Sequence, residues 1–222
     1  MSIPKVIHYC WFGGNPLPPL AQKCIASWKE YCPDYEIIEW NETNFDLNFN
    51  AYVQEAYQAQ KWAFITDVVR LYVLCHYGGI YMDTDVEVLK SLDPILSYNA
   101  GLPLFQELLN DYENDHFVKA DGSFDLTTNV TRITNTLLKY GLVQNNTKQT
   151  VADFTLFPSD YFCPKDPVTK KLHLTSNTYT IHHFDGSWIP KKIKYKYMIL
   201  NKLGPNISQL LVKMKRAFRK YC

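Results

Sequence analysis

Residues 77–85 read Tyr77-Gly78-Gly79-Ile80-Tyr81-Met82-Asp83-Thr84-Asp85. Gly78-Gly79 predicts the end of a preceding helix, because glycine readily adopts the left-handed backbone of a helix C-cap. The apolar residues that follow predict a short buried strand, with the two aspartates at its carboxyl end. Alternate side chains of an extended segment point the same way, so we expect Asp83 and Asp85 to converge.

Two converging carboxylates make an oxygen-rich site that suits Mg²⁺ or Mn²⁺. Such a cation acts as a Lewis acid and neutralises the charge that builds up on a diphosphate leaving group. An Asp-x-Asp tripeptide alone is more often a solvated turn. The apolar approach to Asp83 favours the metal-site interpretation, because acids that leave a buried strand are costly without a cation or donors.

The segments around this motif predict an α/β layer. Strands are expected at 5–11, 35–40 and 80–82, and helices at 20–31, 51–60 and 61–77. This alternation is typical of a mostly parallel sheet flanked by helices, in which ligands bind beyond the carboxyl ends of the strands. The second half is less regular, with helices expected at 104–112 and 131–140 and strands at 154–157 and 179–184.

The helix before the motif carries a second charged pair. Asp67 and Arg70 are three residues apart and therefore share one helical face. They could form an internal salt bridge. They could equally hold sugar hydroxyls, since together they supply acceptors and a fork of donors.

Composition indicates a globular chain that suits one domain, with 222 residues of which 46% are apolar.

The charge is unevenly distributed. Residues 1–185 hold 13 Lys/Arg against 22 Asp/Glu, a net charge of −9, whereas residues 186–222 hold 10 Lys/Arg and no acid. From residue 206 the tail has an amphipathic helical pattern, which predicts binding to an anionic membrane surface or simple packing on the domain. No nucleic-acid partner is expected, because the tail has no recognised binding module and the acidic body would repel phosphate.

The six cysteines form no CxxC pair, so a zinc site is not expected. The first residues lack the apolar stretch of a signal peptide, and no run of 18 apolar residues predicts a membrane span. These features together predict a cytoplasmic protein with reduced thiols.

Four motifs in this order resemble glycosyltransferase family 32. They are Ile7-His8-Tyr9-Cys10-Trp11-Phe12-Gly13-Gly14, Phe64-x-x-Asp67-x-x-Arg70, the stretch from Tyr77 to Asp85, and His182-His183-Phe184-Asp185-Gly186-Ser187-Trp188. That family includes bacterial capsule, O-antigen and exopolysaccharide transferases and the yeast initiating α-1,6-mannosyltransferase. The motifs are also similar, more distantly, to the large clostridial glucosylating toxins. The resemblance implies a GT-A fold (Rossmann-like, with a mostly parallel sheet flanked by helices) over residues 1–190. The amphipathic pattern of the tail predicts that a basic C-terminal helix follows within 191–222.

The resemblance also implies roles for particular residues. Implied catalytic residues are Asp83, Asp85, Asp67 and Arg70. Implied donor-binding residues are Trp11, Phe12, Gly13, Phe64, Asp67, Arg70, Tyr81, Asp83, Ser187 and Trp188, with Trp11 stacking on the base. The implied ligands of Mn²⁺ or Mg²⁺ are Asp83, Asp85 and His182. His182 and His183 face opposite sides of a strand, so only one is expected to serve, and a core position is the alternative for each.

The expected activity is retaining transfer of a hexose, namely galactose, glucose or an N-acetylhexosamine, from a UDP-sugar. The expected acceptor is a glycan or a lipid-linked oligosaccharide in bacterial capsule, O-antigen or exopolysaccharide synthesis, at the inner face of the membrane. One alternative is a mannosyltransferase that uses GDP-mannose. Another is a catalytically weak sugar-nucleotide binder, because only Ser97 to Leu104 stands where family members carry a longer stretch.

Overall fold

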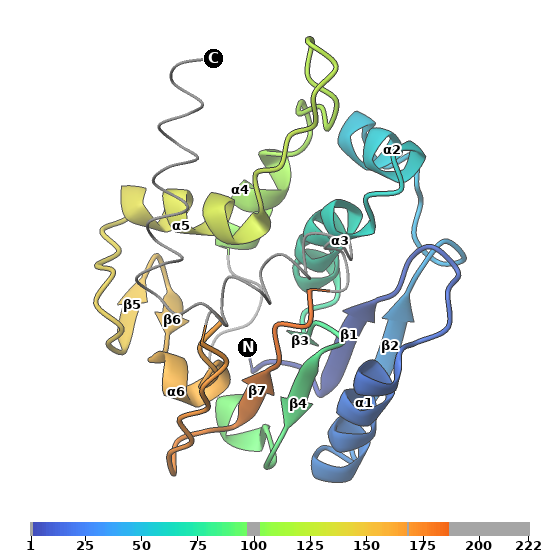
Figure 1. Ribbon diagram of the computed structural model, residues 1–222. Helices are drawn as coiled ribbons and strands as arrows, with labels where there is room; N and C mark the ends of the chain where they lie inside the picture. The colour runs from blue at the N-terminus through green and yellow to red at the C-terminus, as the bar shows by residue number, and fades with distance from the viewer. Residues whose placement is uncertain (1, 97–102, 168, 187–222) are drawn as a thin grey trace.

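The computed structural model describes residues 2–96, 103–167 and 169–186. Its centre is a parallel sheet in which β1 (Val6–Cys10) lies between β2 (Glu36–Trp40) and β3 (Ile80–Tyr81) (Figure 1). Ile7 of β1 pairs with Ile37 on one side and with Ile80 on the other. A strand covered on both faces needs a nearly continuous apolar run, and the sequence Val-Ile-His-Tyr-Cys of β1 provides one.

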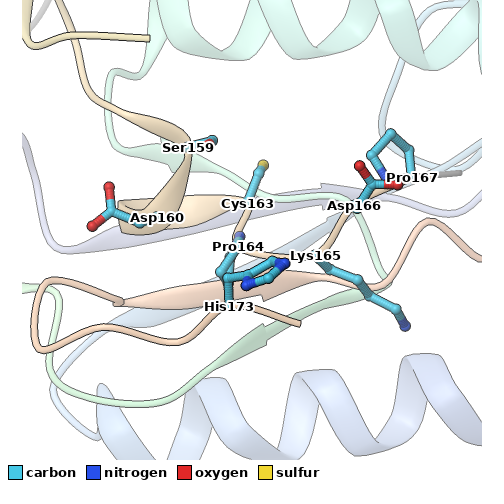
Figure 2. A pocket seen from close by; sticks show the side chains of 8 residues that line it. All are labelled: Ser159, Asp160, Cys163, Pro164, Lys165, Asp166, Pro167 and His173. Atoms are coloured by element: carbon cyan, nitrogen blue, oxygen red, sulfur yellow. The ribbon is translucent and has the colours of Figure 1, made fainter. Parts of the chain in front are cut away.

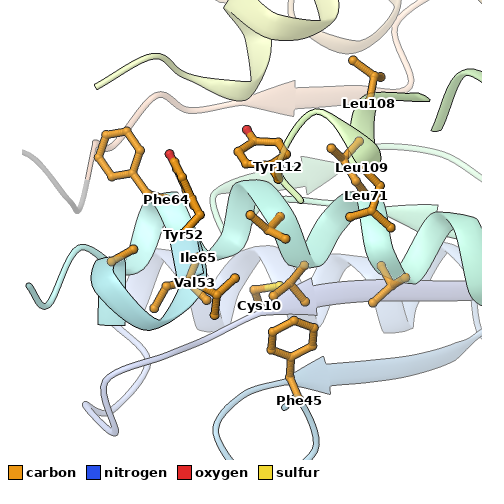
Figure 3. Packing of buried hydrophobic residues seen from close by; sticks show 14 of the residues in the cluster. Cys10, Phe45, Tyr52, Val53, Phe64, Ile65, Leu71, Leu108, Leu109 and Tyr112 are labelled. Carbon is orange, nitrogen blue, oxygen red and sulfur yellow. The ribbon is translucent and has the colours of Figure 1, made fainter. Parts of the chain in front are cut away.

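Helices cover both faces of this sheet. On one face, α2 (Ala51–Gln58) and α3 (Trp62–His76) pack over Cys10 together with α4 (Pro103–Asn110) (Figure 3). On the other face, α1 (Pro19–Tyr31) buries Ile25 and Trp28 against Ile7 and Tyr9. The alternation of β1 side chains therefore divides the core into two clusters.

A second, antiparallel pair of strands lies beside the first sheet. It joins β4 (Val86–Val88), which follows the aspartates, to β7 (Thr180–His182). Helix α1 holds β4 with side chains: Trp28 Nε1 donates to the Val86 carbonyl at 2.7 Å, and Ser27 Oγ accepts from the Val88 amide at 2.9 Å. The position of β7 therefore depends on α1 through β4.

The remaining elements connect these layers. They are the 3₁₀ turn Asp93–Ile95, α5 (Asn129–Lys139), the hairpin strands β5 (Gln149–Val151) and β6 (Phe154–Leu156), and α6 (Ser159–Phe162).

The expected α/β architecture, with a parallel sheet flanked by helices, is confirmed. Every strand and helix expected before residue 82 is present within one or two residues of its predicted bounds. Strands β4 and β5 and helix α6 were not expected, because segments of three or four residues carry no periodicity. The expected tail helix and the expected donor contacts Ser187 and Trp188 lie outside the described residues. Among the helices that the structure describes, none is long and apolar enough to cross a membrane.

Candidate active site

The two aspartates of the motif lie in a tight turn between β3 and β4. The Met82 amide still pairs with the His8 carbonyl of β1, at 3.0 Å, and the chain then turns so that the Val86 amide donates to the Asp83 carbonyl at 3.0 Å. The prediction of a fully extended strand end was therefore wrong in detail. The turn forms because β4 must change direction to pair with β7 rather than extend the parallel sheet.

Asp83, Asp85 and His182 form one cluster. Each offers a ligand atom, and these atoms lie within 4.8 Å of one another. His182 Nε2 is 3.1 Å from Asp85 Oδ1 and 3.9 Å from Asp83 Oδ2. Two carboxylate oxygens and an imidazole nitrogen at this spacing fit a divalent cation such as Mn²⁺, with positions left for water or phosphate.

The electrostatics of the cluster follow from its geometry. Burial lowers the pKa of His182, but hydrogen bonds with Asp85 and Cys163 outweigh it and raise the pKa to about 10. Burial acts to raise the pKa of Asp85, yet His182 and the Asp185 amide, which donates to Oδ2 at 2.8 Å, hold that pKa below its usual range. The two acids thus favour a positive charge between them, which a proton on His182 or a metal ion can supply.

The neighbouring histidine belongs to a different network. His183 Nε2 lies 2.7 Å from Glu87 Oε2, and Lys23 lies 2.8 Å from the other oxygen of Glu87. The His183 amide also donates to the Asp85 carbonyl at 2.9 Å. Of the two histidines, His182 is therefore the one whose ring faces the aspartates.

Helix α3 brings Arg70 to the same site. Its guanidinium lies 3.1 Å from Asp83 Oδ1 and 3.3 Å from Asp67 Oδ1, and 4.6 Å from the centre of the Tyr81 ring. Burial raises the pKa of Asp67, against the opposing effect of Arg70. Arg70 therefore joins α3 to the aspartate turn, and both alternatives for the Asp67–Arg70 pair remain open, since a salt bridge at a cavity wall can also present donors to a ligand.

Asn129, which the sequence motifs do not include, holds Asp67 on the side away from Arg70. Its amide donates to Asp67 Oδ2 at 2.9 Å, and its side-chain Nδ2 donates to the Asp67 carbonyl at 2.8 Å. Thr128 caps α5 by accepting from the Thr131 amide. The residues Thr127-Thr128-Asn129 could have indicated a helix start, but nothing local indicates the contact with α3.

The first motif lies at the same edge of the sheet. Because His8 pairs with Tyr81 in parallel register, Trp11 follows β1 where Asp83 follows β3. Trp11 is half-buried, and its indole donates to the Asn15 carbonyl at 2.5 Å. The Gly13 amide donates to Glu42 at 2.6 Å.

Two of the expected donor-binding residues are buried in the core. Phe12 packs edge-on against Phe45, and Phe64 packs against Phe117, with both phenylalanines buried. Each side chain has little exposed surface for a ligand to contact, and the donor contacts expected of Phe12 and Phe64 stay predictions. Both residues support the site from behind.

A cavity of about 320 Å³ opens beside Asp83 and His182. Its wall includes Arg70, Tyr81, Asp83, His182 and Cys163. This volume falls within the ~300–1,000 Å³ of typical small-molecule sites. Asp83, His182 and Arg70 therefore border a space that a sugar-phosphate group could enter.

Residues 18–102 match the family model described as "Glycosyltransferase sugar-binding region containing DXD motif". The matched region includes Asp67, Arg70, Asp83 and Asp85. The match supports a glycosyltransferase family for the chain, and membership of family 32 in particular stays a prediction.

The relatives it resembles are yeast enzymes. Inositol phosphoceramide mannosyltransferase 3 of Schizosaccharomyces pombe is 34% identical over 107 residues, 45% of this chain and 29% of that protein. Inositol phosphoceramide mannosyltransferase 1 of the same yeast is 30% identical over 127 residues, 52% and 38% of the two chains. Mannosyl phosphorylinositol ceramide synthase CSH1 of Saccharomyces cerevisiae is 32% identical over 115 residues, 45% and 27% of the two chains. The chain thus spans about a third of the length of these relatives.

Among solved structures, the chain is similar to the PaToxG glycosyltransferase. The TM-score is 0.36 and the sequence identity is 22%, over 41% of this chain and 45% of that chain.

Proposed function

We propose that this protein is a metal-dependent mannosyltransferase. It takes mannose from GDP-mannose and transfers it to a hydroxyl of a glycan or a lipid-linked acceptor. The observation that carries the proposal is the convergence of Asp83, Asp85 and His182 beside the Asp67–Arg70 pair. Both aspartates of the motif and the Asp67–Arg70 pair lie in the region that matches a DXD-type sugar-binding family.

The relatives favour mannose over the hexoses expected first. The three yeast proteins described above are named for mannosyl transfer, and none is named for capsule or O-antigen synthesis. These relatives therefore favour GDP-mannose as the donor. The support for a UDP-hexose is the likeness of Trp11 to the base-stacking residue of the toxins.

Each charged residue has a role in this proposal. Asp83, Asp85 and His182 would hold the cation, which when bound neutralises charge on the departing diphosphate. Asp67 would accept hydrogen bonds from sugar hydroxyls, and Arg70 would donate to the sugar or the diphosphate through its planar fork. Because Arg70 already bridges two acids, its guanidinium is oriented before a ligand arrives, which lowers the entropy cost of binding.

Retention of configuration is part of the proposal. The acceptor oxygen would bond to the anomeric carbon on the face that the diphosphate leaves, and the leaving phosphate oxygen would take the acceptor proton. A β-linked product from an α-linked donor, identified by NMR, would contradict this step.

The deciding experiment measures GDP release from GDP-mannose, with UDP-glucose and UDP-galactose in parallel, in Mn²⁺ and in EDTA. The variant Asp85→Asn removes a charge from the cluster, and Asp121→Asn is a matched change at an exposed loop. We expect Mn²⁺-dependent turnover of GDP-mannose that falls at least a hundredfold in Asp85→Asn and stays within twofold in Asp121→Asn. Turnover of a UDP-sugar alone would overturn the choice of donor.

A second candidate is a sugar-nucleotide binder with little turnover. The short connection between the turn Asp93–Ile95 and α4 favours it, because less chain is present to build the pocket floor. Calorimetric binding of GDP-mannose without product formation, lost in Asp85→Asn, would support this candidate over the enzyme.

We also propose a location at an anionic, cytoplasmic bilayer surface, supported by the basic composition of residues 191–222. Sedimentation of the full chain and of residues 1–190 with phosphatidylserine vesicles tests it. Equal binding by the two proteins would remove the proposal.

A further inference from the structure

We infer that a second cavity, next to the one over the aspartates, is the acceptor site and takes a hydroxyl-rich ring such as a sugar or a cyclitol. This inference rests on the proposed function and adds the place and the chemical class of the second substrate. A transferase that joins two substrates needs two sites that meet at the reacting atoms.

The second cavity has a volume of about 380 Å³ and lies between α6 and the segment that follows it (Figure 2). Its lining residues are Ser159, Asp160, Cys163, Pro164, Lys165, Asp166, Pro167 and His173. Cys163 belongs to the walls of both cavities. His182 also lines the first cavity, so the shared wall at Cys163 and the candidate metal ligand belong to the same cavity.

The chemistry of the lining fits a neutral polyol. Carboxylates of Asp160 and Asp166 accept hydrogen bonds, Lys165 donates, and the imidazole of His173 can do either. An anionic ligand would meet two carboxylates here. Asp160 already accepts from Thr175, Asp166 accepts from the Thr169 amide, and Lys165 Nζ lies 3.4 Å from His183 Nδ1. A hydroxyl both donates and accepts, so it can add to these contacts, because each carboxylate has several acceptor positions. The mixture of signs therefore favours hydroxyls over phosphate as the recognised groups.

The cavity wall is held to the strand that carries His182. The Tyr179 amide donates to the Tyr161 carbonyl at 2.7 Å, and Thr180 Oγ1 donates to the Phe162 carbonyl at 2.8 Å. Further along, the His173 amide donates to the Pro164 carbonyl at 3.0 Å. An acceptor bound in the second cavity would thus keep a fixed position relative to His182.

The reaction at this junction balances in atoms and charge. An acceptor hydroxyl oxygen forms a bond to the anomeric carbon of mannose, and the bond from that carbon to the diphosphate oxygen breaks. The bonding electron pair leaves with the diphosphate, and the acceptor proton goes to the same leaving oxygen. Nothing is oxidised or reduced, and water in place of the acceptor gives hydrolysis of the donor.

The test compares transfer with hydrolysis in one protein. GDP-mannose and Mn²⁺ are supplied with methyl α-D-mannoside or with myo-inositol as the probe acceptor. The variants are His173→Ala and Lys165→Met, and the control is His76→Ala, which changes an exposed histidine that lines neither cavity. His173 is exposed and its hydrogen bond to the Pro164 carbonyl comes from the backbone amide, so His173→Ala is expected to fold.

We expect both cavity variants to raise the KM for the acceptor and to lower the ratio of transfer to hydrolysis at least tenfold, while His76→Ala keeps both values. An unchanged ratio in both variants would place the acceptor elsewhere. A wild-type protein that hydrolyses GDP-mannose but transfers to neither probe would overturn the ligand class. A wild-type protein with no hydrolysis would instead count against the proposed function itself.

Discussion

His182 Nε2 lies 3.1 Å from Asp85 Oδ1, although the two residues are far apart in the sequence. The contact exists because β7 pairs with β4 in a register that sets His182 opposite Val86. The candidate metal cluster is therefore a product of tertiary structure, and its members can be tested one against another.

The two adjacent histidines should differ sharply in their effect on metal binding. We expect His182→Gln to weaken Mn²⁺ binding at least tenfold, because it removes a ligand, and His183→Gln to weaken it less than threefold. Manganese EPR titration of the purified protein measures both. Equal losses of Mn²⁺ affinity in the two variants would contradict the assignment of His182 as the metal ligand of the pair.

Arg70 should contribute strongly to stability as well as to activity. Arg70→Ala leaves Asp67 and Asp83 without their shared cation in a partly buried site. Removing one partner of a buried ion pair lowers the free energy of unfolding by about 3–5 kcal/mol. Arg70→Lys keeps the charge but loses the fork that reaches both acids, so we expect a smaller loss of stability and a large loss of turnover. Urea unfolding and GDP release separate the two effects, and a fully active Arg70→Lys would contradict the bridging role.

Gly79 should be far less tolerant of substitution than its backbone angle alone suggests. Its φ is +79°, and an added Cβ would lie 2.7 Å from the Val6 carbonyl oxygen. Gly122 has almost the same φ, +78°, with no atom within 4 Å of an added Cβ. We expect Gly122→Ala to cost about 1 kcal/mol through the backbone alone, and Gly79→Ala to cost more because β1 must shift. Equal melting temperatures for the two variants would show that the close approach is unimportant.

Stability should fall in acid partly through Asp125. Burial acts to raise its pKa, but Thr127 and Arg132, which lies 2.9 Å away, hold the pKa below its usual value. The carboxylate therefore adds stability above its unfolded pKa of about 3.9, and that contribution is lost as pH falls through the lower folded value. Urea unfolding between pH 7 and pH 2 should show wild type and Asp125→Asn converging toward low pH. A difference in the free energy of unfolding between the two proteins that stays constant with pH would assign the effect to packing instead of charge.

The sequence predicted the first half of the fold well because its signals are local. The periodicity of α3 and the glycines after it mark where the helix ends and β3 begins, and Gly78 has the expected left-handed φ of +67°. The cluster of acids was likewise evident from the Asp-x-Asp spacing. The bond from Asn129 to Asp67 and the place of Cys163 could not be predicted, because both depend on chain segments that meet only in the folded protein.

The burial of Phe12 and Phe64 shows that the motifs contain core residues as well as exposed polar ones. Phe12 stands between Trp11 and Gly13 and packs against Phe45, and Phe64 packs against Phe117. A motif constrains the supporting core as well as the groups that meet a ligand.

The central position of β1 has a consequence for how this protein can be divided. The region that matches the sugar-binding family begins at residue 18, after β1 has ended at Cys10, and it stops long before His182. Cutting the chain at those limits would remove the middle strand of the sheet and leave the aspartates without their imidazole. The matched region is thus not a transplantable module, and a chimera that exchanges donor specificity must carry β1 and β7 along with it.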